Sequence, residues 1–168
     1  AATSIGTNAF EYCTSLTAAS FPAATSIGDD AFYACTSLTA ASFPVATRID
    51  NYAFYSCSAL TDVSFPAATT IGTYAFASCS AFTTASFPAA TSIGSFAFTN
   101  CYNLLSFYLD SVSAVPTLGA SAFYYTPIGG RTTSTGGAYG SVFVPASLYS
   151  SFLTATNWSS IADRIVSV

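Results

Sequence analysis

Five cysteines recur along the chain at a constant spacing of 22 residues. Thiols can bind zinc, form disulfides or act as nucleophiles, so a regular set of them is the first candidate for chemistry. Each role needs a particular arrangement of the sulfur atoms and their neighbours. The role therefore depends on how the chain positions this set, which is Cys13, Cys35, Cys57, Cys79 and Cys101.

The residues between the cysteines repeat with the same period, and a period of this length is typical of a solenoid. The repeated positions are apolar and the variable ones are polar or small, so one face of each coil should be buried against its neighbours. The repeated residues are Ile5, Ile27, Ile49, Ile71 and Ile93; Ala9-Phe10, Ala31-Phe32, Ala53-Phe54, Ala75-Phe76 and Ala97-Phe98; Leu16, Leu38, Leu60, Phe82 and Leu104; and Phe21-Pro22, Phe43-Pro44, Phe65-Pro66 and Phe87-Pro88.

Each copy contains the signals of two short elements. In "LTAASFP" the alternation of Leu38, Ala41 and Phe43 before a proline predicts a short strand. In "AFYAC" the spacing from Ala31 to Cys35 fits a single helical or 3-10 turn. One strand and one turn per 22 residues predict an α/β repeat solenoid of the leucine-rich-repeat type. We expect a right-handed arc with parallel strands on its concave face and the turns on its convex face.

The run "ATSIGDDAFYACTSLTAASFP" resembles the BspA-like leucine-rich repeats of bacterial and protozoan surface proteins, over residues 1 to about 110. It departs from the family pattern at the centre of the strand, where Ala19, Ala41 and Ala85 replace a larger aliphatic residue. The phenylalanines before the prolines are expected to fill that space. The resemblance implies a non-enzymatic module at the cell surface.

The chain divides into three consecutive parts of one structural domain. Residues 1–110 form five repeats, and residues 111–145 form a degenerate sixth repeat with a Gly-rich loop, "GGRTTSTGGAYG". In this sixth repeat Thr126 occupies the cysteine position. Residues 146–168 are expected to form a C-terminal cap of two short amphipathic helices, because apolar residues recur at helical spacing. These residues are Leu148, Phe152, Trp158, Ile161 and Ile165.

No such cap precedes the first repeat, since the chain begins in mid-repeat with "AATSIG". We therefore expect a fragment of a longer protein, or a first coil that another chain covers.

The period decides between the possible roles of the cysteines. Stacked coils place equivalent residues about 4.8 Å apart, so the sulfur atoms should form a straight column. Zinc needs converging ligands and a catalytic thiol needs a base, and the chain contains no histidine. Disulfides between neighbours would leave one cysteine over. We interpret all five cysteines as free, solvent-shielded residues that fill the core, with no metal or cofactor.

The acidic residues do not form a catalytic pattern, because they occupy different positions of the repeat. Asp29 and Asp30 are the only neighbours, and adjacent acids in a turn are usually solvated; calcium binding there is a weaker reading. The complete set is Glu11, Asp29, Asp30, Asp50, Asp62, Asp110 and Asp163. The Gly-rich loop lacks the strand-loop-helix context and lysine of a phosphate-binding loop. We therefore predict no enzyme activity.

The composition argues against nucleic-acid binding and electrostatic membrane binding. The chain has three arginines, no lysine and a net charge of -4, and charged residues make up only 6% of it. Phosphate backbones and anionic lipids are bound by clustered basic residues. No apolar run reaches the roughly 18 residues of a membrane span.

Two surfaces are candidates for contact with a partner. The first is the outward side of the strands, which is flat and small until Tyr108, and the second is a set of aromatic residues near the turns. The residues of the first surface are Ser42, Asp62, Ser64, Thr84, Ser86 and Tyr108, and those of the second are Tyr52, Tyr74 and Phe96. Packing along the coil edge is the simpler reading of the second set; stacking platforms for sugars or a contact strip are the alternatives.

Two functions are consistent with these features. The first is an extracellular or cell-surface adhesion and protein-interaction module, whose partner is a host or neighbouring-cell protein or a glycan. The alternative is a structural subunit that assembles with copies of itself into a fibre, sheath or phage-type appendage, which the monotony of the repeats favours.

Overall fold

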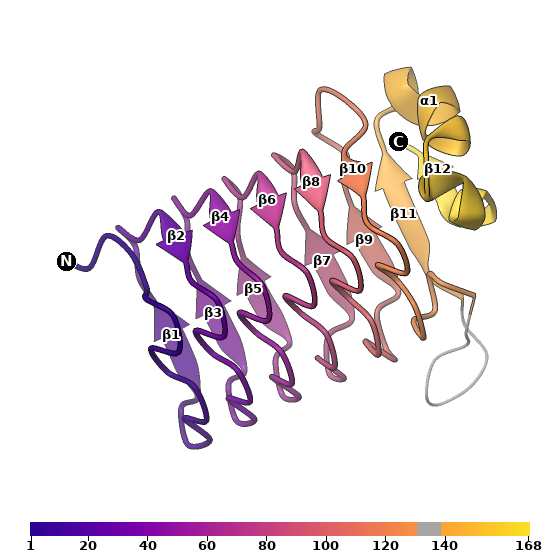
Figure 1. Cartoon of the computed structure of the whole chain (residues 1–168). Coiled ribbons are helices and arrows are strands. Elements are labelled where there is room, and N and C mark those ends of the chain that lie inside the picture. Colours follow the sequence, from indigo (N-terminus) through magenta and orange to yellow (C-terminus); the bar gives the residue numbers. More distant parts are fainter. Residues whose placement is uncertain (131–138) are drawn as a thin grey trace.

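The computed structural model describes residues 1–130 and 139–168, apart from the side chain of Asp62. Six coils stack along one axis, and a cap lies beyond the sixth coil (Figure 1). Each of the first five coils contains a three-residue strand, and the four-residue β11 continues this column of strands. They are β1 (Ala18–Ser20), β3 (Ala40–Ser42), β5 (Asp62–Ser64), β7 (Thr84–Ser86), β9 (Ser106–Tyr108) and β11 (Ser141–Val144).

The coils contain a second column of strands that the sequence analysis did not predict. Its members are two residues long and form one parallel five-stranded sheet: β2 (Ser26–Ile27), β4 (Arg48–Ile49), β6 (Thr70–Ile71), β8 (Ser92–Ile93) and β10 (Thr117–Leu118). Strands this short show no alternation of apolar and polar residues, so periodicity could not reveal them. The expectation of one strand per coil was therefore incomplete.

The predicted turn in "AFYAC" is present, but it does not continue as a helix. The N–H groups of Ala31 and Cys35 donate to the carbonyl oxygens three residues earlier, as in a 3-10 turn. Asp30 and Ala34 adopt left-handed backbone angles, with φ of 54° and 56°. Equivalent left-handed residues recur in every coil, and they turn the chain tightly enough to close it.

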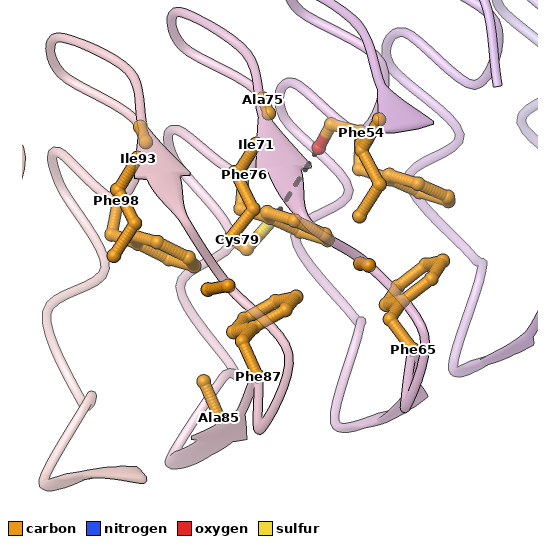
Figure 2. Close-up of a cluster of buried hydrophobic side chains, with 14 of the residues drawn as sticks. Phe54, Phe65, Ile71, Ala75, Phe76, Cys79, Ala85, Phe87, Ile93 and Phe98 are labelled. Atoms are coloured by element: carbon orange, nitrogen blue, oxygen red, sulfur yellow. Dashed lines mark hydrogen bonds between the residues drawn. The ribbon is translucent and has the colours of Figure 1, made fainter. Parts of the chain in front are cut away.

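Phenylalanine columns form the core between the column of three-residue strands and the column of two-residue strands (Figure 2). One column contains the phenylalanine of the Ala-Phe pair, and its rings stack nearly parallel. Phe32 and Phe54 lie 5.0 Å apart at an interplanar angle of 5°, and Phe54 and Phe76 lie 5.2 Å apart at 1°. The second column contains the phenylalanine of the Phe-Pro pair and meets the first edge to face, as for Phe54 and Phe65 at 62°. Both geometries are favourable for aromatic pairs.

The second phenylalanine column fills the space left by the small residue at the centre of the strand. Ala85 and Phe87 are both fully buried in the fourth coil. In the fifth coil the large and small residues are exchanged: Phe107 takes the central position of the strand, and the smaller Leu109 follows the strand. The exchange keeps an aromatic ring in the column, since Phe107 packs 5.7 Å from Phe87.

Hydrogen bonds along the axis connect each coil to the next. Threonines one repeat apart form a ladder: the Oγ1 of Thr47 donates to the carbonyl of Thr25, and that of Thr69 donates to the carbonyl of Thr47. The backbones of neighbouring coils approach closely at the glycine after the isoleucine, where a Cβ on Gly94 would lie 2.5 Å from the carbonyl carbon of Gly72. This close approach favours glycine at the position, although Asp50 occupies it in the third coil.

The three-residue strands form two sheets rather than one. β1, β3 and β5 form the first sheet, and β7, β9, β11 and β12 (Ile165–Ser167) form the second. At this division the phenylalanine spacing widens, because Phe65 and Phe87 lie 6.2 Å apart whereas Phe43 and Phe65 lie 5.4 Å apart. The continuous sheet of the two-residue strands joins the two halves.

The cap consists of a 3-10 turn (Ala146–Leu148), α1 (Tyr149–Thr154), a 3-10 segment (Trp158–Arg164) and β12. Phe152 and Trp158 are fully buried and pack edge to face at 5.0 Å. The expectation of two helices was wrong at Ile165, which lies in β12 and pairs with Val142 of β11. This strand covers the last edge of the sheet, which a helix would have left unpaired.

Among the described residues, no helix is long and apolar enough to span a membrane.

The stacked core predicts a large effect of removing a central ring. We expect Phe54→Ala to lower the free energy of unfolding by about 3 to 5 kcal/mol, because the ring is fully buried between two others. Urea denaturation followed by fluorescence measures this change. Thr36→Ala at an exposed turn position is the control and should change stability by less than about 0.5 kcal/mol. Equal effects of the two substitutions would contradict the assignment of the core.

Candidate functional site

Four of the five cysteines lie in the core, between the phenylalanine columns and the turns. Cys35, Cys57, Cys79 and Cys101 are fully buried. The Sγ of Cys57 donates a hydrogen bond of 3.1 Å to the carbonyl oxygen of Phe32, 25 residues earlier, and that of Cys79 donates one of 3.2 Å to the carbonyl of Phe54 (Figure 2). Each thiol thus satisfies a carbonyl of the preceding coil.

Burial suppresses the reactivity of these thiols. It raises the pKa of Cys35 to about 11 and that of Cys101 to about 12, although a hydrogen bond opposes the shift at both residues. Burial also raises the pKa values of Cys57 and Cys79 well above the usual range. Because the thiolate is the nucleophile and the metal ligand, these four residues have neither chemistry available at neutral pH.

The expectation of a shielded thiol is wrong for Cys13, which is exposed. The other four cysteines are covered by the coil before their own, and Cys13 belongs to the first coil of the chain described here. The same position explains why Phe10 and Leu16 are only partly buried, whereas their counterparts Phe32 and Leu38 are fully buried.

Thr126 replaces the cysteine in the sixth coil and uses its hydroxyl differently. Its Oγ1 donates to the carbonyl of Phe123 in its own turn at 2.6 Å and accepts a hydrogen bond from the N–H of Gly129 at 2.9 Å. The cysteine position of the repeat therefore accommodates a small polar side chain when the hydrogen bonds of that side chain are satisfied.

The acidic residues do not gather into a metal site. In the described part of the chain, no three of the residues His, Cys, Asp or Glu lie close enough to hold an ion. Asp29 has a structural contact that its neighbours in the sequence did not indicate: its Oδ1 accepts a hydrogen bond from the N–H of Asn51 in the next coil. Asn51 makes the same contact with Thr73. These side chains connect turns of successive coils.

The first candidate surface lies on the outward side of the three-residue strands, which we call the sheet face. Ser42 of β3, Ser64 of β5 and Thr84 and Ser86 of β7 point outward, since the central residues of β3 and β7 are buried. Asp62 lies in β5, but its side chain is outside the described part of the structure. A shallow hollow of about 220 Å³ lies over β1, β3 and the end of β5, lined by small residues. The sheet face is therefore nearly flat.

Tyr108 stands apart from the rest of the sheet face because it has an aromatic partner. Its ring stacks on Phe143 of β11 at 4.6 Å and 13°, since β9 and β11 pair in register. Phe143 points outward between the buried Val142 and Val144. The repeat pattern does not indicate that Phe143 belongs to this surface, because the register across the intervening residues does not follow from the repeat.

The second candidate surface is a regular row of partly exposed rings along the turns. Tyr52, Tyr74 and Phe96, which we call the aromatic row, stack face to face at 5.0 and 4.9 Å with interplanar angles of 10° and 5°. Tyr33 and Tyr55 form a parallel pair beside it at 4.9 Å, and Tyr55 contacts Tyr52 at 5.8 Å and Tyr74 at 6.4 Å. The structure thus brings these aromatic residues together into one surface.

All three residues of the aromatic row adopt left-handed backbone angles, with φ of 55° or 56°. Asn8 and Asp30 occupy the same position in the first two coils. Asparagine and aspartate tolerate this conformation well, whereas a bulky residue there is unfavourable by about 1 kcal/mol or more. The three residues form only two stacked pairs, each of which contributes about 0.5 to 1.5 kcal/mol, so the stacking does not exceed the cost of the three backbone conformations.

Acidic residues flank the N-terminal end of the aromatic row. Burial raises the pKa of Asp30, and the nearby charges of Glu11 and Asp29 raise it further. Burial also raises the pKa of Asp50, which is only partly countered by Arg48 at 2.8 Å. The surface beside the row is therefore negatively charged and is not compensated by lysine, which the chain lacks.

The architecture places the chain among leucine-rich-repeat solenoids. The family description "BspA type Leucine rich repeat region" matches residues 3–128 in six copies. The chain therefore belongs to the BspA-type leucine-rich repeat family, as its sequence resemblance predicted. Proteins with leucine-rich repeats generally mediate protein interactions. No curated protein matches the sequence at a significant level.

Solved structures with the same fold come from several bacteria. The leucine-rich repeat protein of T. pallidum is 27% identical with a TM-score of 0.61, over 70% of this chain and 62% of that one. A leucine-rich cell surface protein of Faecalibacterium prausnitzii is 27% identical with a TM-score of 0.58, over 73% of this chain and 40% of that one. A leucine-rich repeat protein of Bacteroides ovatus shares the fold at 20% identity and a TM-score of 0.63, over 93% and 37% of the two chains. The match thus spans less than two thirds of each of these proteins.

The burial of the thiols predicts how they react. In the folded protein we expect a maleimide reagent to label one thiol quickly, because only Cys13 is exposed, and in denaturant to label all five. Mass spectrometry after timed labelling counts the modified residues. Cys13→Ser should abolish the fast reaction, and fast labelling of two or more thiols in the native protein would contradict the burial of the column.

Proposed function

We propose that this chain is a non-enzymatic adhesion module of an extracellular or cell-surface protein, and that it binds a protein partner along the aromatic row. The observation that carries the proposal is the occupation of three successive left-handed positions by Tyr52, Tyr74 and Phe96. The fold itself is satisfied there by asparagine or aspartate, as the first two coils demonstrate. Rings at these positions add little net stability, so a role in recognition accounts for them better.

The sheet face is the weaker candidate for such a partner. Hot spots of protein interfaces are rich in tyrosine, tryptophan and arginine, and the outward residues of β3 and β7 offer none of these. Tyr108 is the exception, and it is already stacked on Phe143.

The stacking geometry favours a protein over a glycan. A sugar binds an aromatic residue by covering the face of the ring, but neighbouring rings in the row cover each other at about 5 Å. Tyr74 has both faces occupied, so a partner meets ring edges and hydroxyl groups. Such a surface suits the mixed apolar and hydrogen-bonding contacts of a protein interface.

The negative charges beside the aromatic row indicate that the partner carries positive charges at the contact. Glu11, Asp29 and Asp30 lie at the N-terminal end of the row; burial raises the pKa of Asp30, and repulsion from the charges of Glu11 and Asp29 raises it further. A partner with arginine or lysine opposite this end would relieve the repulsion and associate faster at low salt.

The test compares the chain with a variant that removes the rings but keeps the backbone. Tyr52→Asn/Tyr74→Asn restores the residue type of Asn8, so we expect stability to change by less than about 1.5 kcal/mol. Binding to a panel of purified extracellular proteins, measured by surface plasmon resonance, should fall at least about tenfold, which corresponds to the loss of about 1.4 kcal/mol.

A matched control is Ser64→Asn/Ser86→Asn on the sheet face, which should leave the binding unchanged. Loss of binding in this control but not in the row variant would contradict the choice of surface. A glycan array distinguishes the sugar alternative, and light scattering of the isolated chain distinguishes assembly with copies of itself. Binding to sugars alone, or association into large particles that depends on the row, would refute the proposal of a protein partner.

A further inference from the structure

The turns of successive coils are joined by a hydrogen-bond ladder with one direction. In each of the first five coils, N–H groups two residues apart donate to carbonyl oxygens of the following coil. Asn8 and Phe10 donate to Asp29 and Ala31 at 3.0 and 2.7 Å, and Phe96 and Phe98 donate to Ala120 and Ala122 at 3.1 and 2.9 Å. This donor ladder therefore ends, at the sixth coil, with N–H groups that require acceptors.

Two other columns of hydrogen bonds, which we call the isoleucine column and the threonine column, run in the opposite direction. In these columns a backbone carbonyl accepts a hydrogen bond from an N–H of the following coil. The carbonyl of Ile93 accepts from the N–H of Gly119 at 2.7 Å, and that of Thr91 accepts from the N–H of Thr117 at 3.0 Å. These columns end with carbonyls that require donors.

The cap supplies side-chain donors to both of these carbonyls. The Nδ2 of Asn157 donates to the carbonyl of Leu118, which ends the isoleucine column, at 2.6 Å. The indole Nε1 of Trp158 donates to the carbonyl of Pro116, which ends the threonine column, at 2.8 Å. The cap thus replaces the missing coil for the columns that end in acceptors.

Two positions of the donor ladder have no such replacement. Their terminal N–H groups belong to Ser121 and Phe123, which correspond to Phe96 and Phe98 of the fifth coil. Neither N–H has a hydrogen-bond acceptor in the part of the chain that the structure describes. Phe123 is buried, whereas Ser121 is exposed. A buried backbone donor without an acceptor is unfavourable, and nearly all buried donors find a partner.

A cavity of about 260 Å³ lies between these donors and the cap. Ser121 and Phe123 line it on the side of the sixth coil, and Asn157, Ser160 and Ile161 line it on the side of the cap. The equivalent N–H groups of the earlier coils all point toward the following coil, so those of Ser121 and Phe123 point toward the cap. The cavity occupies the position at which a following turn would place its carbonyls.

We propose that this cavity binds a peptide segment whose backbone carbonyls, two residues apart, accept hydrogen bonds from Ser121 and Phe123. Five coils of this chain provide that pair of acceptors to the equivalent donors, so the recognition chemistry is present in the fold itself. Among the described residues no arginine lines the cavity, and the chain has no lysine, so a neutral carbonyl suits these lining residues better than a phosphate or another anion. The peptide extends the ladder, as added strands extend a sheet edge.

The site is separate from the aromatic row and does not depend on the function proposed for that row. Phe96 is the last ring of the row and belongs to the fifth coil, whereas the cavity lies beyond the sixth.

The experiment follows the amide resonances of Ser121 and Phe123 in the uniformly ¹⁵N-labelled chain. The probe is the acetylated and amidated peptide with the sequence of residues 29–34, DDAFYA, whose Asp29 and Ala31 carbonyls are acceptors in the ladder. We expect a saturable downfield shift of both amide protons, because a hydrogen bond deshields them. Sodium acetate is titrated in parallel as an anionic acceptor.

Two variants test whether the shift comes from the cavity. Ser160→Phe places a ring in the cavity and should abolish the shift, whereas Ser159→Phe, at an exposed residue outside the lining, should retain it. A spectrum with dispersed resonances confirms that each variant is folded. The proposal is overturned if the peptide shifts neither amide, if acetate alone shifts them, or if Ser160→Phe binds as the original chain does.

Discussion

The hydrogen-bond ladder between successive coils is the constraint on which the rest of this structure depends. It holds equivalent residues of neighbouring coils about 5 Å apart, so each repeated side chain must pack against a copy of itself. Planar rings satisfy this condition well, because two phenylalanines stack at about the same spacing, as Phe32 and Phe54 do at 5.0 Å. The core is therefore built from columns of identical residues rather than from the interlocking of different ones.

The same constraint explains the very low charge of the chain. A charged residue repeated in every coil would lie about 5 Å from a like charge above and below it, which is unfavourable. The charged residues accordingly do not repeat at their positions. Asp29 is followed by Asn51, Glu11 by Tyr33, and Arg48 by Thr70. The surface is instead built from serine, threonine and tyrosine, whose hydroxyls can form ladders such as that of Thr25, Thr47 and Thr69.

Much of the fold could be predicted from the sequence, because the period fixes which residues share a column. It predicted the strand around Ala41, the core phenylalanines and the burial of four cysteines. It could not predict features that depend on the ends of the columns, where the repeat stops. Cys13 is exposed, Ile165 lies in a strand, and Tyr108 is paired with Phe143, all because their neighbours lie outside the regular period. The stacking in the aromatic row also required the structure, since the sequence does not reveal which way a side chain on a left-handed residue points.

The left-handed residue of each turn has a consequence for how this surface can change. Hydrogen bonds to the coils on either side hold the backbone at Tyr52 and Tyr74, so the conformation there does not depend on the side chain. Asparagine, aspartate, tyrosine, phenylalanine and serine all occupy this position in the six coils at nearly the same φ. The solenoid therefore carries a line of evenly spaced positions that can be altered one at a time without refolding the rest. Its recognition properties can diverge from coil to coil while the scaffold stays constant.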